Sequence, residues 1–312
     1  MITVFGSINL DLVTLVARLP GPGETIATTH YDTYPGGKGA NQALAAARAG
    51  AQVAMVGSVG EDDFADLALA PLEAAGIDIT GIVRRPGHTG IAMISVDPSG
   101  ENQIVAANGV NLDSLASQLD EPRAETTLLL QMETQADENW IAIRAAHAHG
   151  VRTILNVAPA APIPADILEI LDVLVANELE VAIVAGDLGR AGSGSDDAAR
   201  HLVAAGVGVV IVTLGAAGAV AHTPEATWKI GVPNVAVVDT VGAGDSFVGA
   251  LAAALDGGAD LGLAFHRAAI AGSLACRRLG AQSSIPDAAE IDAWVPRLDP
   301  PNQRYLTLGE QR

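Results

Sequence analysis

The chain has 312 residues, of which 49% are hydrophobic, and it carries 36 acidic against 17 basic side chains, a formal net charge of −19. The apolar fraction excludes a disordered chain, and no apolar run reaches the roughly 18–20 residues that a membrane span needs. The acidic excess argues against nucleic-acid and anionic-membrane partners, which are bound by surplus Lys and Arg.

Strand-like and helical segments alternate along most of the chain. The predicted strands lie at residues 2–5, 52–59, 127–131, 153–156, 173–176 and 209–213. The predicted helices lie at 39–49, 63–75, 135–149, 164–171, 177–185 and 196–205, with Asp196 as a plausible cap of the last. This alternation predicts a mainly parallel sheet covered by helices on both faces, a three-layer α/β/α architecture.

Two segments interrupt this pattern. Residues 20–34 and 89–108 are rich in β-forming residues, and the second contains a turn at Asp97–Gly100. We interpret them as strands of a small sheet that forms a lid. The chain is then one α/β domain, residues 1–312, with a β lid built from insertions at about 12–34 and 89–108.

The strongest chemical signal is VAVVDTVGAGDSFVG at 235–249. An apolar strand is predicted to end at Asp239, and Gly242, Ala243 and Gly244 then lead into a helix. Glycines let the backbone approach a phosphate, and the helix N-terminus favours negative charge, so this turn predicts an anion hole. Asp245 beside it could take a proton from an attacking hydroxyl. The alternative is that Asp245 only stabilises the first helical turn.

Other nucleotide and metal motifs do not fit. A dinucleotide fingerprint requires a third glycine where Phe247 stands, which disfavours a nicotinamide-dependent oxidoreductase. A Walker A loop requires Ser or Thr after Gly-Lys, but Lys38 is followed by Gly39. The one cysteine, Cys276, excludes a disulfide framework. The N-terminus has no basic flank of a signal peptide, so we expect a cytoplasmic protein.

A second group of polar residues predicts a ligand rich in hydroxyl groups. The turn at 35–41 supplies Gly37, Lys38 and Asn41, and the end of the first strand supplies Asn9 and Asp11. Amide and carboxylate groups can together hold adjacent hydroxyls, although each motif alone could be turn chemistry. Polar residues also follow later strands, where ligands bind in open α/β sheets, although each could instead be a helix cap: Glu133, Asn156, Asn177, Glu178 and Glu180.

The segments GGKGANQA (36–43) and DTVGAGDSF (239–247) resemble the two signatures of the ribokinase/phosphofructokinase-B family of sugar kinases. The resemblance covers nearly the whole chain, from GSINLD through TGIAMISVDPSGEN, ANELE and TLGAAG to RRLGAQSSIP. It implies transfer of the γ-phosphate of ATP to the 5-hydroxyl of D-ribose. The same fold could serve deoxyribose, a ketose or a nucleoside, or less readily a non-catalytic binding protein.

The resemblance also implies roles for individual residues. Asp245 is the implied base, and Gly242, Ala243 and Gly244 form the implied anion hole. The sugar-binding positions are Asn9, Asp11, Gly37, Lys38, Asn41, Glu133 and Asp245, and the nucleotide-binding positions are Asn177, Thr213, Gly215, Gly218 and Gly244. Glu180, with Asn177, organises Mg²⁺ through water, and a K⁺ site would use Asp239, Val241, Ala275, Arg278, Gly280 and Ser284. Family members commonly form homodimers through the lid.

Two segments depart from the family pattern. Residues 266–269 (HRAA) stand where an Asn near the adenine is often found. The turn Thr213–Gly218 lacks the Ser and the basic residue often found within it. Both departures leave the nucleotide contacts less well defined than the sugar contacts.

Overall fold

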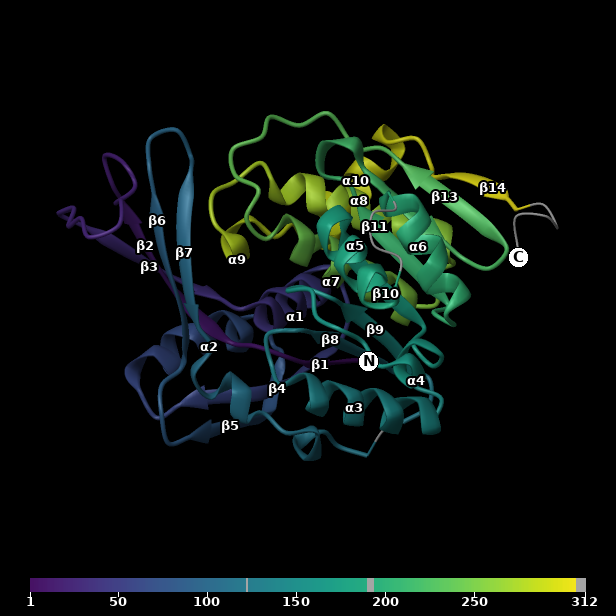
Figure 1. The fold of residues 1–312 in the computed structure, drawn as a ribbon, viewed down its shortest axis with the longest axis horizontal. Helices are drawn as coiled ribbons and strands as arrows, with labels where there is room; N and C mark the ends of the chain where they lie inside the picture. The colour runs from purple at the N-terminus through teal and green to yellow at the C-terminus, as the bar shows by residue number, and fades with distance from the viewer. Residues whose placement is uncertain (122, 190–193, 307–312) are drawn as a thin grey trace.

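The computed structural model describes residues 1–121, 123–189 and 194–306, which form two β-sheets surrounded by helices (Figure 1). The large sheet has the strand order β14-β13-β12-β11-β10-β9-β8-β1-β4-β5. It is parallel from β11 to β5, and β12, β13 and β14 are added antiparallel at one edge. Its strands are β1 (Ile2–Phe5), β4 (Val53–Gly60), β5 (Asp78–Arg85), β8 (Thr127–Gln131), β9 (Arg152–Asn156), β10 (Val173–Asn177), β11 (Val209–Thr213), β12 (Ala219–His222), β13 (Ala226–Ile230) and β14 (Asn302–Tyr305).

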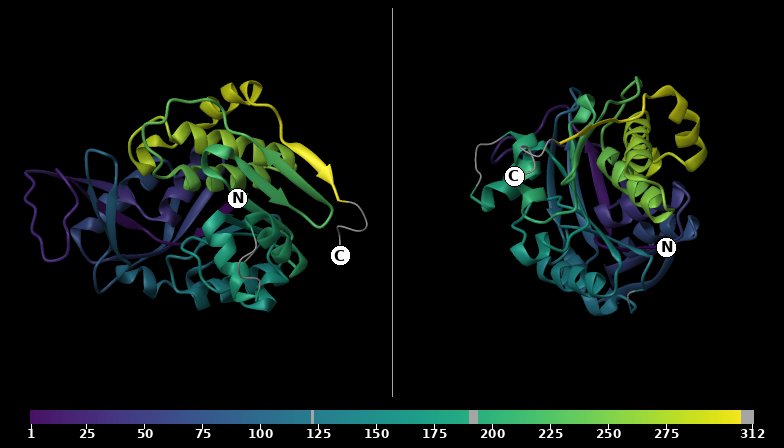
Figure 2. Two further views of the ribbon diagram at one scale, coloured as in Figure 1. Left: turned by 45° about the horizontal axis from the view of Figure 1, so that its top comes forward. Right: turned by 90° about the vertical axis from the view of Figure 1, so that its right-hand side faces the viewer.

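Alternate residues of the central strands point to opposite faces of the sheet and divide the core into two clusters. Leu129 faces the first cluster, whereas Leu128 and Leu130 face the second. Helices α1 (Lys38–Arg48), α2 (Asp63–Ala74), α7 (Ala243–Asp256) and α8 (Leu261–Ala275) cover the first face. Helices α3 (Ala136–Ala148), α4 (Ala165–Leu168), α5 (Glu178–Asp187) and α6 (Ser195–Ala204) cover the second. The three-layer prediction is confirmed, and Figure 2 shows the layers from two further sides.

The second sheet has the order β3-β2-β6-β7 and extends from one end of the molecule (Figure 1). Its strands are β2 (Asn9–Leu15), β3 (Tyr31–Gly36), β6 (Gly90–Val96) and β7 (Asn102–Ala107). Strand β2 begins only a few residues after β1, so the residues at its start stay next to the carboxyl edge of the large sheet. The shorter helices α9 (Ala281–Ser284) and α10 (Ala288–Trp294) follow α8.

Four local predictions were wrong. Residues 235–239 are not a strand, because the backbone N–H groups of Val238 and Asp239 donate to the carbonyl of Cys276 after α8 rather than to a neighbouring strand. Residues 20–30 contain no strand, since Pro20 and Pro22 alternate with glycines. Gly194, not Asp196, is the N-cap of α6. The helix predicted at 164–171 is limited to Ala165–Leu168.

In the part of the chain that the structure describes, the helices are too short or too polar to cross a membrane.

Candidate active site

Asp245 lies in the first turn of α7, where its carboxylate meets the amides of α1. Helix α7 begins after Gly242, which has the left-handed φ of 73° that glycine adopts without strain. Asp245 is only 8% exposed. Its Oδ2 accepts a hydrogen bond from Asn41 Nδ2 at 3.0 Å, and its Oδ1 accepts one from Gln42 Nε2 at 2.9 Å. The two sequence motifs therefore meet at one carboxylate.

The close approach of α1 and α7 depends on a glycine. A Cβ atom at Gly249 would lie 2.4 Å from Ala45 Cβ and 2.7 Å from the Gln42 carbonyl oxygen, which real side chains do not tolerate. Because Gly249 has no side chain, the two helices pack backbone to backbone. This packing brings Asn41 and Gln42 within hydrogen-bond distance of Asp245.

Glu133 connects the turn before α1 to the end of β1. Its Oε2 accepts hydrogen bonds from Ser7 Oγ at 2.5 Å and from the Lys38 backbone N–H at 3.0 Å. Gly37 has φ of 87°, and a Cβ there would lie 2.8 Å from the backbone nitrogen of Asn9. Asn9 and Asp11 follow on β2, which pairs with β3 so that Asn9 faces Gly36. The predicted sugar-binding residues thus share one corner of the fold.

The charges of this corner act on one another. Burial, and then the charges of Glu133 and Asp245, raise the pKa of Asp11 to about 7. Burial alone would lower the pKa of Lys38, but the attraction of Asp245, Glu133 and Glu180 outweighs it and raises that pKa. Lys38 therefore remains a cation in a half-buried position.

A cavity of about 240 Å³ lies against these groups. It is lined by Lys38, Asn156, Ala158, Val175, Ala176, Asn177, Glu180, Thr213, Thr240, Gly242, Gly244, Asp245 and Val248. Eight of these lining residues were singled out from the sequence: Lys38, Asn156, Asn177, Glu180, Thr213, Gly242, Gly244 and Asp245. Gly215 and Gly218, the remaining glycines of the 213–218 turn, do not line it.

Asn177 and Glu180 also form a capping box at the start of α5. Asn177 Oδ1 accepts from the Glu180 N–H at 2.8 Å, and Glu180 Oε2 accepts from the Asn177 N–H at 2.8 Å. Their capping role, one of the alternatives open from the sequence, is therefore present. Because both residues also line the cavity, capping and ligand binding can coexist at this helix start.

The residues predicted for a monovalent cation lie in the turn before α7 and in the segment from the end of α8 onward, and none of them lines the cavity. Asp239 Oδ1 accepts from the Val241 N–H at 3.0 Å and Oδ2 from the Gly280 N–H at 2.9 Å. A carboxylate has about four acceptor positions, so Asp239 retains capacity for a cation. Arg278 pairs with Glu290 through its guanidinium, and Ser284 Oγ donates to the Ala281 carbonyl, while Ala275 ends α8. Among the described residues, no three His, Cys, Asp or Glu side chains cluster as a metal site.

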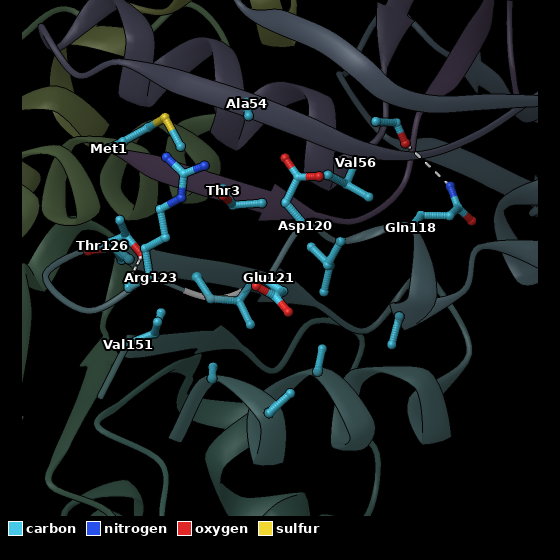
Figure 3. A pocket seen from close by; sticks show the side chains of 18 of the residues that line it. Met1, Thr3, Ala54, Val56, Gln118, Asp120, Glu121, Arg123, Thr126 and Val151 are labelled. Atoms are coloured by element: carbon cyan, nitrogen blue, oxygen red, sulfur yellow. Dashed lines mark hydrogen bonds between the residues drawn. The ribbon is translucent and has the colours of Figure 1, made fainter. Parts of the chain in front are cut away.

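A larger hollow, of about 690 Å³, lies away from this site (Figure 3). Its floor is formed by Thr3, Ala54 and Val56 of β1 and β4, and its walls by α3 and by residues 116–121, 123 and 126. It contains none of the residues that the sequence singled out. Size therefore does not identify the candidate active site here, whereas the convergence of titratable groups does.

Sequence reasoning missed the contact of Gln42 with Asp245 and the buried amides that Gln42 meets. These are Gln131, which was not considered, and Asn156, which was noted only as a polar residue after a strand. Gln42 lies within the GANQA segment, but nothing in the sequence distinguishes it from any other polar residue of a helix. The only signal was its position next to Asn41, which does not indicate which side chain it touches.

The comparisons with known proteins agree with this geometry. Residues 1–288 match the model of the pfkB family carbohydrate kinases. The chain belongs to that family. It is therefore a carbohydrate kinase, and the two signature segments described above are those that meet at Asp245.

The chain is 37% identical to a ribokinase of Schizosaccharomyces pombe over 93% of this chain and 96% of the relative. It is 35% identical to a bifunctional ribokinase/ribose-5-phosphate isomerase A of Fructilactobacillus sanfranciscensis over 99% of this chain, but spans only 57% of that relative's length. A deoxyribokinase of Salmonella typhi is 32% identical over 94% of this chain and 98% of the relative.

Among solved structures, an Arabidopsis thaliana ribokinase complexed with ribose and ATP superimposes with a TM-score of 0.84 at 30% identity. The match covers 94% of this chain and 98% of that structure. The pfkB-family assignment therefore holds in both sequence and fold.

Proposed function

We propose that this chain is an ATP-dependent kinase that phosphorylates the 5-hydroxyl of D-ribose. The observation that carries the proposal is the Asp245 carboxylate, held at the start of α7 beside the Gly242–Gly244 turn and in the same cavity as Lys38. The ribokinase relatives support ribose as the acceptor.

In the proposed reaction the acidic corner binds the sugar. Asn9, Asp11 and Asn41, with the backbone of Gly37 and the side chains of Lys38 and Glu133, hold the ring hydroxyls. Asp245 accepts the proton of the 5-hydroxyl as its oxygen forms a bond to the γ-phosphorus. The bond from that phosphorus to the bridging oxygen breaks, and ADP leaves. The N–H groups of residues 242–244 at the α7 N-terminus stabilise the charge on the transferring phosphoryl group.

The nucleotide would lie along the carboxyl ends of β10 and β11. Asn177 and Thr213 line the cavity there, and Gly215 and Gly218 are proposed nucleotide contacts through the turn that they shape. Mg²⁺, the general cofactor of ATP-dependent kinases, neutralises the phosphate charge when bound. Glu180, which faces the same cavity, would hold it through water.

We also propose a K⁺ site at Asp239. The carboxylate, the carbonyls of Val241, Ala275, Arg278 and Gly280, and the hydroxyl of Ser284 are oxygen donors, which suit a hard cation. Asp239 already connects the backbone before α7 to Gly280. A cation there would tighten the turn that forms the anion hole without entering the cavity.

The small sheet is proposed as a lid of a single domain and as a homodimer interface. Strand β7 is exposed along its whole length, and large apolar side chains of the sheet face solvent: Leu15, Tyr31, Tyr34, Met93, Ile104 and Val105. A second copy would cover this surface. Light scattering after gel filtration should find a dimer, and Ile104→Lys with Val105→Lys should give monomers; a monomeric wild-type chain would contradict the interface.

The second candidate is phosphorylation of another sugar or a nucleoside, favoured by the deoxyribokinase relative. ADP release should therefore be measured over pentoses, deoxyribose, hexoses and nucleosides, with and without K⁺. We expect the highest kcat/KM with ribose; a higher value with deoxyribose or a nucleoside would replace ribose as the substrate.

The base assignment is tested with Asp245→Asn. A positioned base contributes about 10²–10⁴-fold to the rate. The kcat of this variant should therefore fall by about 10²-fold or more, while its affinity for the sugar stays similar. Asp260→Asn is the matched control, since Asp260 caps α8 and asparagine caps equally well. Turnover by Asp245→Asn at the wild-type rate would refute the assignment.

A further inference from the structure

Gln42 is a buried amide that contacts Asp245 and does not line the cavity. Its side chain is 0% exposed. Its Nε2 donates to Asp245 Oδ1 at 2.9 Å and to Asn156 Oδ1 at 2.9 Å, and its Oε1 accepts from Gln131 Nε2 at 2.8 Å. Of its hydrogen-bond partners, Asp245 and Asn156 line the cavity, so any effect of Gln42 on the reaction must pass through one of these two residues.

A chain of contacts determines which way the Gln42 amide points. Asn156 Nδ2 donates to the Val175 carbonyl oxygen at 3.1 Å, which leaves Asn156 Oδ1 as an acceptor toward Gln42. Asp245 Oδ1 is also an acceptor. A reversed Gln42 amide would place its oxygen against these two acceptors and lose both hydrogen bonds. Gln131 does not decide the orientation, because its Oε1 has no partner and its amide can reverse together with that of Gln42. The backbone carbonyl of Val175 on β10 thus determines, through Asn156, the orientation of the Gln42 amide.

Asn41 and Gln42, the two amides that donate to Asp245, differ in whether a polar atom remains free for substrate. Asn41 Nδ2 donates to Asp245 Oδ2, but its Oδ1 has no hydrogen-bond partner although it is buried, so this side chain retains capacity for a sugar hydroxyl. Gln42 has its polar atoms occupied by protein groups. Gln42 therefore has no polar atom left for the substrate, and its contact with the carboxylate is the same with and without sugar.

We propose that Gln42 is the positioning residue of the catalytic base. It fixes the rotation of the Asp245 carboxylate, so that the lone pairs not used by the amides face the acceptor hydroxyl, and Asn156 orients Gln42 in turn. The proposal rests on the proposed role of Asp245 as base. Small displacements of a reacting group lower rates by up to about 10².

The first test is Gln42→Leu, which keeps the volume and removes the donor. We expect kcat to fall about 10–100-fold while KM for sugar and for ATP changes less than about threefold. Gln118→Leu is the matched control. Gln118 also loses hydrogen bonds, to the Gly57 and Gly81 carbonyls and from Arg85, but on the far side of the sheet. It should lower the melting temperature and leave kcat unchanged.

The second test is Gln42→Glu, whose effect depends on pH. A protonated Glu at 42 has one O–H, which can replace the amide's hydrogen bond to Asp245 Oδ1 but not the second one to Asn156, whereas an ionised Glu repels the carboxylate. We expect its kcat relative to wild type to approach one at low pH and to fall as the pH rises, with melting temperatures measured at each pH. A purely structural amide would give a kcat ratio that does not depend on pH.

The outcomes separate this inference from the proposed function. If Asp245→Asn keeps its turnover, the base assignment fails and the role of Gln42 fails with it. If Asp245→Asn is inactive but Gln42→Leu retains kcat within about threefold, only the positioning role is overturned. If Gln42→Leu does not fold, the pH dependence of Gln42→Glu decides, and a flat ratio overturns the proposal.

Discussion

Asp11 should lower the stability of the folded protein at neutral pH, and Asp11→Asn should remove this effect. Burial and the neighbouring charges of Glu133 and Asp245 raise the pKa of Asp11 from 3.8 to about 7. Between these two pH values the folded chain binds more protons at this site than the unfolded chain. The free energy of unfolding therefore falls as the pH rises from about 4 to about 7, and the loss is complete above that.

The size of the effect follows from the pKa difference. Each pKa unit corresponds to about 1.4 kcal/mol, so a shift from 3.8 to about 7 amounts to about 4 kcal/mol at pH 8. Asp11 is only partly buried, so solvent screening reduces this upper limit to roughly 2–4 kcal/mol. Asparagine has the same shape and no charge, so it avoids the cost.

Urea unfolding of both proteins without ligands, at pH 5 and at pH 8, measures the difference. We expect Asp11→Asn to be more stable than wild type at pH 8, with a smaller difference at pH 5. Asp113→Asn, at an exposed position after β7, is the control and should differ from wild type by less than about 0.5 kcal/mol at both pH values. A pH-independent difference, or a less stable Asp11→Asn at pH 8, would refute the electrostatic reasoning.

Three further predictions concern the same structure. KM for the sugar should rise as the pH falls below about 7, because the proposed contact uses the ionised Asp11; a pH-independent KM between 6 and 8 would exclude this use. Gly242→Ala should lower kcat at least about tenfold and stability by about 1–2 kcal/mol, since φ is 73° and a Cβ would lie 2.9 Å from Ala281 Cα; unchanged steady-state rates would contradict it. Asp62→Ala should cost about 1–3 kcal/mol in urea unfolding with kcat unchanged, because Asp62 caps α2 and accepts two hydrogen bonds from Thr89, away from the cavity.

The layered fold could be predicted because its signals are local. Strands such as 127–131 and 209–213 have the predicted bounds, since short apolar runs between turn residues form buried strands wherever they pair. The segment 235–239 has a similar composition but pairs with no strand, and its Val237 and Val238 are exposed. The sequence cannot show which apolar run has a free sheet edge next to it.

The candidate site was predictable as separate motifs, not as one constellation. Asp245 and Asn41 were each singled out, but their contact depends on Gly249, which looked like one small residue among the alanines of its helix. The same limit applies to Gln42, whose partners come from β8, β9 and α7. The sequence of one segment does not show which side chains of other segments will contact it.

The distribution of charge in the site explains how a chain of net charge −19 can use an anionic co-substrate. The proposed sugar-binding corner holds Asp11, Glu133 and Asp245 around the half-buried cation of Lys38. Carboxylates accept hydrogen bonds from a neutral polyol, but they repel phosphate. The phosphate therefore needs groups of positive potential, and the cavity offers two kinds, the Lys38 ammonium and the N–H groups at the α7 N-terminus. The overall charge thus excludes polyanions that need a basic surface, while a single nucleotide needs only one helix start and its own cation.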